Sequence, residues 1–383
     1  MDTRSTGLEG KITDEALDDL RSRIGSEFVT KTPPNLEETT KDAIRHWAHA
    51  IGDLDPKWTD AGYASATRFG GITAPPSIIY GIDLRSIGSR VGLPGIHSFF
   101  AGADHEFYLP IRRNDAISLK VVFTDLIEKK SRFAGRMFQQ VSECTFTNQD
   151  GEVVARTWPW GMRTERTEGS SRGKYKDLEL GHYTQADIDK ISETYSHEHE
   201  LVRGAKTRYF DDVEVGEVLG PFIRGPWTPT ISINFLHAHG GMFLQSHAFW
   251  YDYIRRHPKA ALPNEMGIPE GPVRGHWDSD FARKVGVRAA YDYGPERLSW
   301  LMTLCTYWCG DDGWLKKIRA EVRGFNLVGD LTTVQGRVVD TTDEGDTGTA
   351  HVEITATDQR DIVTASATAQ IALPKRKKTS SNG

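Results

Sequence analysis

The feature that most constrains the fold of this chain is an internal repeat within its 383 residues. The matching pairs are 44–52 with 233–241, 58–64 with 276–282, and Asp115 with Asp330. The offset is 189 residues for the first pair, 218 for the second and 215 for the third. Two copies of one unit therefore make up most of the chain. The change in offset predicts an insertion of about 29 residues in the second copy, within 242–275.

Each copy combines helical patterns with a run of strands. Apolar spacing and capping residues predict helices over 13–24, 36–51, 77–88, 185–200, 231–239 and 294–309. Alternating apolar and polar residues predict strands over 118–123, 137–147, 153–158, 318–322, 331–339, 350–357 and 362–372. The helix over 294–309 is apolar nearly all round, which is typical of a helix that a sheet wraps on most sides.

The repeat also predicts where the domains begin and end. We expect an N-terminal unit over 1–163, a linker with one helix over 164–205, a C-terminal unit over 206–374 and a tail over 375–383. The linker is expected because its first part is charged and rich in glycine and serine, as flexible connections are.

Composition excludes several classes of partner. The net charge is −6 and no basic stripe occurs, so we expect no nucleic-acid partner. No window of about 20 apolar residues occurs, so we expect no membrane partner. The N-terminus lacks the pattern of a secretory signal and the chain has three cysteines, which together predict a cytoplasmic protein. Cys305 and Cys309 lie in an apolar run, so we interpret them as core residues and expect no metal.

Two groups of segments carry a resemblance to a known family. The segments 52–58 (Gly-Asp-Leu-Asp-Pro-Lys-Trp) and 70–76 resemble the N-terminal half of the MaoC-like dehydratases, which are (R)-specific enoyl-CoA hydratases. The segments 208–217, 276–286 and 328–330 resemble a second domain of the same type. The resemblance covers about 36–163 and 206–374. It implies an α+β double hot-dog fold, in which two antiparallel sheets each wrap a long central helix and form an intrachain pseudo-dimer.

The resemblance also implies a reaction. Proteins of this family bind an acyl-CoA thioester between two hot-dog units and add water across the double bond beside its carbonyl. An Asp and a His, spaced as in Gly-Asp-x-Asn-Pro-x-His, hold and activate the water. A backbone N–H at the start of the central helix stabilises the enolate oxygen. The resemblance implies no cofactor.

Both copies depart from the Asp/His spacing. The N-terminal copy has Asp53, but Trp58 stands where the His belongs. The C-terminal copy has His276, but Gly271 stands five residues before it. Without the insertion, His247 fits the His position instead, with Met242 in the place of the Asp.

The start of the central helix separates the two copies further. Counting from His276 places the family's helix-start glycine at Gly294, whereas the same count from Trp58 gives Pro76. Proline has no N–H and cannot stabilise an enolate. We therefore expect the C-terminal half to carry the chemistry and the N-terminal half to make room for the acyl group.

The candidate site residues follow from these counts, each with an ordinary structural role as the alternative. The catalytic candidates are His276, His247, Asp53 and Glu270, and the substrate-binding candidates are Gly294, Asp292, His239 and Trp58. Glu270 is included because it is the nearest acid upstream of His276.

The sequence thus predicts a hydro-lyase that interconverts a 2-enoyl-CoA and a 3-hydroxyacyl-CoA. Aromatic residues near the start of the insertion suggest a bulky acyl group, such as a branched, aromatic or steroid side chain. Two alternatives remain, a hot-dog thioesterase and a non-catalytic acyl-CoA-binding subunit. We expect either a homodimer or a complex with a partner hot-dog subunit.

Overall fold

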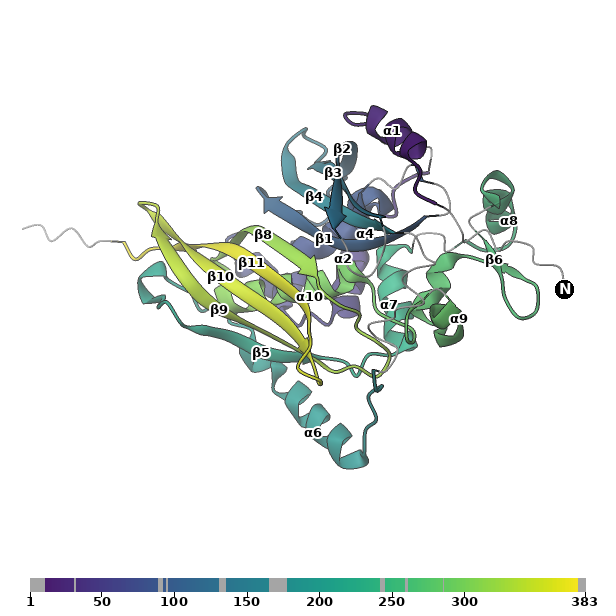
Figure 1. The fold of residues 1–383 in the computed structure, drawn as a ribbon. Coiled ribbons are helices and arrows are strands. Elements are labelled where there is room, and N and C mark those ends of the chain that lie inside the picture. The colour runs from purple at the N-terminus through teal and green to yellow at the C-terminus, as the bar shows by residue number, and fades with distance from the viewer. Residues whose placement is uncertain are drawn as a thin grey trace, which may run out of the picture.

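The fold is built on one large antiparallel sheet (Figure 1). The computed structural model describes residues 11–30, 32–88, 92–93, 96–130, 136–164, 178–241, 245–258, 261–284 and 286–377. Within these residues, nine strands form the sheet in the order β2-β3-β4-β1-β8-β11-β10-β9-β5. The strands are β1 His97–Phe107, β2 Ser118–Lys130, β3 Arg136–Thr147, β4 Val153–Thr164, β5 Val218–Arg224, β8 Trp314–Val322, β9 Thr332–Asp343, β10 Thr347–Asp358 and β11 Val363–Pro374.

The strand order repeats the symmetry of the sequence. The N-terminal strands run β2-β3-β4-β1, and the C-terminal strands run β9-β10-β11-β8 from the other side. The two halves meet where β1 pairs with β8, with His105 opposite Ile318. A buried hydrogen bond of 2.6 Å joins the Tyr80 hydroxyl to His105 Nε2 at this junction. The chain therefore folds as the double hot-dog that the sequence predicts, with the sheets of the two halves continuous.

The core is organised around the helix α10 (Gly294–Cys309), which contacts strands of both halves. Every residue from Pro295 to Cys309 is buried, as the all-round apolar pattern predicts. Removing that apolar surface from water is the largest favourable contribution that one helix can make to such a core.

The N-terminal half has no matching long helix in its described residues. The expected helix over 77–88 is wrong, because the segment breaks into η2 (Pro76–Ile78), α4 (Ile79–Ile82) and η3 (Leu84–Ile87). The break lies at Asp83, whose backbone is extended and whose carboxylate accepts from the Arg85 N–H at 2.8 Å. Such a local side-chain bond starts a new turn and competes with a continuous helix.

The remaining elements flank the sheet. They are α1 Asp14–Ser22, α2 Lys41–Ile51, η1 Pro56–Trp58, α3 Ala61–Ala66, α6 Gln185–Ser196, η4 Glu198–Leu201, η5 Phe210–Asp212, α7 Pro229–His239, α8 His247–Arg256, β6 Leu262–Pro263, β7 Pro269–Glu270, η7 Pro272–His276 and α9 Ser279–Lys284. The helix expected over 36–51 begins only at Lys41, because the Thr40 side chain caps it there. The strands β1 and β5 of the large sheet were not predicted.

The caps of α2 and α7 show that the offset between the two copies is one residue shorter than the sequence match gives. Both helices have 11 residues, with Thr40 and Thr228 as their N-caps. They end at Gly52 and Gly240, which both adopt the left-handed conformation. The offset between the copies is therefore 188 residues here, and the insertion in the second copy is one residue longer than the sequence match predicts.

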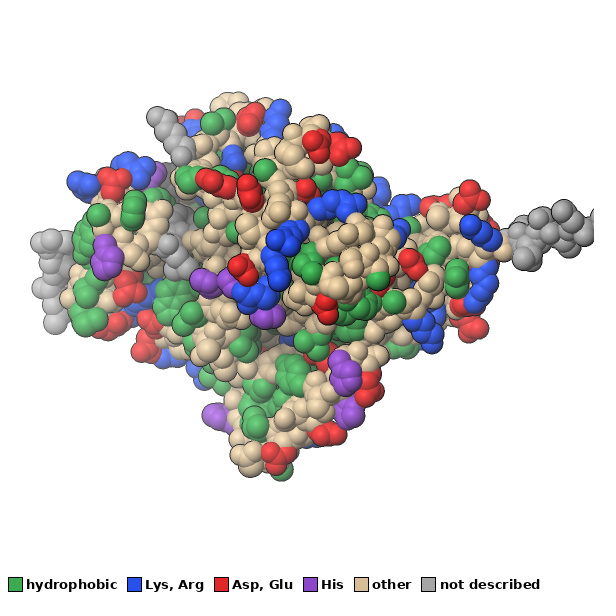
Figure 2. Space-filling view, turned by 180° about the vertical axis from the view of Figure 1, so that it is seen from behind, with side chains coloured by type: hydrophobic (Ala, Val, Ile, Leu, Met, Phe, Trp, Pro, Cys, Tyr) green, Lys and Arg blue, Asp and Glu red, His purple; other side chains and the backbone are tan. Residues whose placement is uncertain are grey.

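Two surface features bear on possible partners. No helix in the described part of the chain is both long and apolar enough to cross a membrane. In the space-filling view, acidic and basic side chains are interspersed over the visible face (Figure 2). The expected domain limits remain a prediction, and the first part of the linker, 165–177, lies outside the described residues.

A buried arginine, Arg224, ties the two halves together and yields a first prediction. Arg224 of β5 pairs with Glu198 at 2.9 Å and donates to the Gly52 carbonyl at the end of α2 at 2.8 Å. Replacing Arg224 with Ala should lower the free energy of unfolding in urea by about 3 kcal/mol or more, because Glu198 would remain buried without its partner. The control is Lys317→Ala, which removes a half-exposed pair with Glu106 and should cost less than about 1 kcal/mol. Equal losses in both variants would contradict the assignment.

Candidate active site

A cavity of about 150 Å³ lies at the N-terminal end of α10. Its wall combines residues of both halves, including two histidines, the first residue of the helix and several aromatic rings. The lining residues that carry the argument are Phe99, Phe100, His239, His276, Asp292, Tyr293, Gly294 and Phe325. The structure thus brings together four of the eight residues singled out from the sequence, namely His239, His276, Asp292 and Gly294.

His276 ends the short helix η7 and has a defined orientation. Its Nδ1 lies 2.7 Å from the Tyr291 carbonyl oxygen. A carbonyl can only accept, so in the neutral ring Nδ1 carries the proton and Nε2 carries the lone pair. The ring also stacks on Tyr293, with centroids 3.6 Å apart. The hydrogen bond sets the tautomer of the neutral ring, and the stacking contact limits its motion.

Gly294 opens α10 at the same cavity. A Cβ added to Gly294 would lie 2.6 Å from Phe100 Cδ1, so a side chain there would displace the ring. The N-cap residue Tyr293 makes no side-chain cap, and Pro295 follows in the first turn. Gly294 and Pro295 line the cavity, so the positive end of the helix dipole adjoins it and favours a developing negative charge there.

Asp292 lines the cavity but has a structural partner. Arg297 donates from Nε to Asp292 Oδ2 at 2.8 Å and also binds the second carboxylate oxygen. Burial raises the pKa of Asp292, and the Arg297 charge opposes that shift. The same guanidinium donates to the carbonyl of Gly324 at 2.7 Å. Asp292 therefore anchors the cavity wall, and both of its oxygens are engaged.

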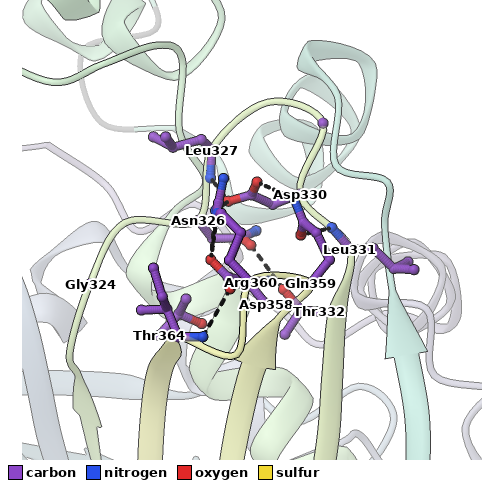
Figure 3. A network of polar contacts seen from close by, with 12 residues as sticks. Gly324, Asn326, Leu327, Asp330, Leu331, Thr332, Asp358, Gln359, Arg360 and Thr364 are labelled. Carbon is purple, nitrogen blue, oxygen red and sulfur yellow. Dashed lines mark hydrogen bonds and ion pairs between the residues drawn. The ribbon is translucent and has the colours of Figure 1, made fainter. Parts of the chain in front are cut away.

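A polar network holds the loop that completes this wall (Figure 3). Asp330 accepts from the Leu327 N–H at 2.8 Å and pairs with Arg360 at 2.5 Å. Gln359 bridges the same loop to the β10–β11 turn, donating to Asp330 at 3.0 Å. The network fixes residues 324–332, which include the cavity residue Phe325.

Sequence reasoning missed a buried carboxyl beside the site. Glu296 is the third residue of α10 and is 1% exposed. The Trp227 indole donates to it at 3.3 Å, and burial together with the nearby Asp292 raises its pKa well above the usual range. An acid in the third position of a helix commonly bonds back to the N-cap backbone, and Glu296 bonds the Tyr293 backbone in this way. The sequence signal that could have identified Glu296 is therefore its place as the third residue of the helix.

The other catalytic candidates lie elsewhere. Asp53 is buried against the middle of α10, where Thr303 donates to it at 3.2 Å. Glu270 accepts from Asn264 at 2.6 Å, and His247 begins the helix α8 of the insertion. Neither Asp53, Glu270 nor His247 is among the described residues that line the cavity.

Trp58 lines a second, smaller cavity of about 50 Å³ between the N-terminal half and the C-terminal end of α10. It shares that cavity with Pro76, so the two residues occupy the positions that correspond to His276 and Gly294. Lys57 lies beside them, buried and paired with Asp55 at 2.8 Å. The second cavity thus repeats the position of the first, but a bulky indole and a proline replace the imidazole and the glycine.

Comparison with known proteins agrees with this fold. Residues 22–157 match the model of the FAS1-like dehydratase domain region. A UPF0336 protein of Streptomyces griseus is 28% identical over 119 residues, which are 29% of this chain and 77% of that protein. A UPF0336 protein of Streptomyces coelicolor is 27% identical over 143 residues, or 36% of this chain and 90% of that protein.

Solved structures extend the match to both halves. A MaoC-like dehydratase superposes with a TM-score of 0.64 at 17% identity, covering 93% of this chain and 100% of that one. A Mycobacterium tuberculosis protein described as having a double hotdog fold gives 0.56 at 10% identity, covering 93% and 97%. The protein is therefore a double hot-dog protein. More particularly, residues 22–157 match the FAS1-like dehydratase domain region, and the predicted resemblance to the MaoC-like dehydratases is confirmed at the level of the fold.

The position of Asp53 yields a prediction about pH. Burial, aided by the nearby Asp55 charge, raises the pKa of Asp53 to about 7, whereas an exposed Asp titrates near 3.8. Between these values the folded protein keeps a proton that the unfolded chain has lost, so stability falls as the pH rises. Asp53→Asn should therefore raise the thermal midpoint at pH 8 relative to wild type and change it little at pH 4. A variant that loses stability equally at both values would contradict this.

Proposed function

We propose that the protein is a hydro-lyase that interconverts a 2-enoyl and a 3-hydroxyacyl thioester of coenzyme A in the cavity of the C-terminal half. The observation that carries the proposal is that His276 and the start of α10 line one cavity. At the corresponding positions of the other half, Trp58 can accept no proton and Pro76 can donate none. The dehydratase names of the related structures support the same class of reaction.

The geometry accounts for both proton movements. His276 Nε2 takes a proton from water while the water oxygen bonds to C3 of the enoyl group. The electron pair of the double bond then moves toward the thioester carbonyl and forms an enolate, which the helix end at Gly294 stabilises. The imidazolium returns its proton to C2, the carbonyl re-forms, and His276 is neutral again. Dehydration is the same sequence in reverse.

The size of the acyl group is part of the proposal. The cavity of about 150 Å³ lies between aromatic side chains that limit how far it can widen. The rings of Phe99, Phe100 and Phe325 form its apolar wall, so a bulky acyl group would have to displace them. The insertion contributes fewer aromatic side chains to the cavity wall than expected, since Phe249 and Tyr251 are 77% and 53% exposed.

A thioesterase is the second candidate. Both oxygens of Asp292, the carboxylate described in the cavity wall, are bound by Arg297, so His276 would have to activate water without a carboxylate. An imidazole that activates water could attack the carbonyl instead of C3. The two reactions differ in their products, since hydrolysis releases a thiol and hydration does not. Butyryl-CoA, which has no double bond, should yield no thiol with this protein. Rapid thiol release from it would favour the thioesterase.

Substitution of the proposed base tests the function directly. His276→Asn should lower kcat with an enoyl-CoA about 100-fold or more, because the amide cannot carry the proton at neutral pH. The matched control is His247→Asn, at an exposed residue of the insertion, which should leave kcat within about twofold of wild type. Unchanged turnover in His276→Asn would refute the assignment. Absence of turnover by the purified wild-type chain would favour a subunit that needs a partner.

Enlarging the wall tests the acyl proposal. Phe100→Ala should raise kcat/KM for an aromatic enoyl-CoA relative to crotonyl-CoA by about tenfold or more, as expected for removing a large apolar obstacle. Equal rates of the wild-type protein with crotonyl-CoA and with bulky enoyl-CoAs would contradict the claim that these rings obstruct a bulky acyl group.

A further inference from the structure

The cavity contains a second imidazole in place of the carboxylate that the reaction normally uses. We propose that His239 holds the reacting water beside His276. The inference rests on the proposed hydration and extends it to a residue whose role neither the fold nor the sequence motif assigns. Five observations, taken in turn, support it.

The first observation is the location of His239. It is the last residue of α7, it is 2% exposed, and it lines the same cavity as His276 and Gly294. Both imidazoles lie near the ring of Tyr293. The centroid of that ring is 3.6 Å from the ring centroid of His276 and 6.1 Å from the ring centroid of His239. A small molecule in the cavity is therefore exposed to both histidines.

The second observation is what the motif position holds. The matching caps of α2 and α7 place Gly241 where the N-terminal copy has Asp53. The working half therefore has no side chain at the position that should orient the water. His239 stands two residues before that position, so an imidazole enters the site from almost the same point of the chain.

The third observation concerns the remaining acid in the wall. Asp292 is the carboxylate among the described lining residues, and Arg297 binds both of its oxygens. Releasing Asp292 to hold water would leave a buried guanidinium without its partner, which is costly. Asp292 is therefore a poor substitute for the missing motif aspartate.

The fourth observation is a comparison between the halves. The residue of α2 that corresponds to His239 is Ile51, which is equally buried. Packing at the end of this helix therefore accepts an aliphatic side chain and does not require an imidazole.

The fifth observation is that Phe235 stacks on His239 with ring centroids 5.2 Å apart, which limits the motion of the His239 ring. A fixed polar ring where packing does not need one points to a role in binding.

The division of work follows from these positions. His239 hydrogen-bonds the water and aims its oxygen at C3, while His276 takes the water proton and returns it to C2. His239 itself gains and loses no proton over the cycle, so the balance of the reaction is unchanged. A neutral hydrogen-bonding side chain should therefore replace His239 in part, although it cannot replace His276.

Three variants test this role. His239→Phe should keep the aromatic stacking and lower kcat about 100-fold with little change in KM. His239→Gln should recover at least tenfold of that loss and keep the wild-type pH profile of kcat, since His276 still sets it. The control His237→Gln, on the exposed face of the same helix, should behave as wild type. A Phe variant within twofold of wild type, or a Gln variant no better than Phe, would overturn the inference and leave the hydratase proposal standing.

A binding measurement separates the two proposals if turnover is absent. Butyryl-CoA is added to protein labelled with ¹³C in its histidine rings, and the His239 signal is assigned with His239→Gln. We expect the His239 and His276 signals to shift while that of His237 does not. If the wild-type protein hydrates no enoyl-CoA, the proposed function fails, and an unshifted His239 signal then overturns the present inference as well. A shifted signal would keep His239 as a ligand-contacting residue of a site with a different reaction.

Discussion

The structure depends on the burial of one helix between two halves of a single sheet. Every residue from Pro295 to Cys309 of α10 is buried, and the helix contacts strands that come from both copies of the repeat. Elements of both copies pack against this helix, so the apolar surface that they share helps to hold the halves together. The start of α10 is consequently fixed relative to both halves, and a site built there has a rigid backbone.

The repeat explains how one scaffold carries two cavities with different linings. The same local structure occurs twice, as the networks around Asp115 and Asp330 show. Gln149 donates to Asp115 at 3.2 Å, and Gln359 donates to Asp330 at 3.0 Å, each from the turn of a corresponding hairpin. The scaffold is therefore symmetric while the side chains have diverged. A broken helix, an indole and a proline occupy one half, and a long helix, an imidazole and a glycine occupy the other.

Much of this was predictable because it depends on local pattern and on counting along the repeat. The all-round apolar pattern predicted α10, and the count from His276 to Gly294 placed both residues at one cavity. The break at Asp83 was not predictable, because the pattern around it is helical and a single side-chain bond to Arg85 decides the outcome.

The side chains that contact the buried acids Asp53 and Glu296 could not be predicted from the sequence either. The position of Asp53 against Thr303 depends on contacts across 250 residues of chain, which no local pattern shows. The same holds for Glu296, whose burial depends on Trp227. The sequence also could not show which aromatic residues of the insertion face solvent, as Phe249 does.

The central claim is that the cavity of the C-terminal half binds the thioester. A crystal structure with butyryl-CoA tests it most directly, because this thioester can be neither hydrated nor dehydrated. The account predicts the thioester oxygen within hydrogen-bond distance of the Gly294 nitrogen, with C3 of the acyl group facing His276. A thioester bound instead beside Trp58 and Pro76 would contradict it.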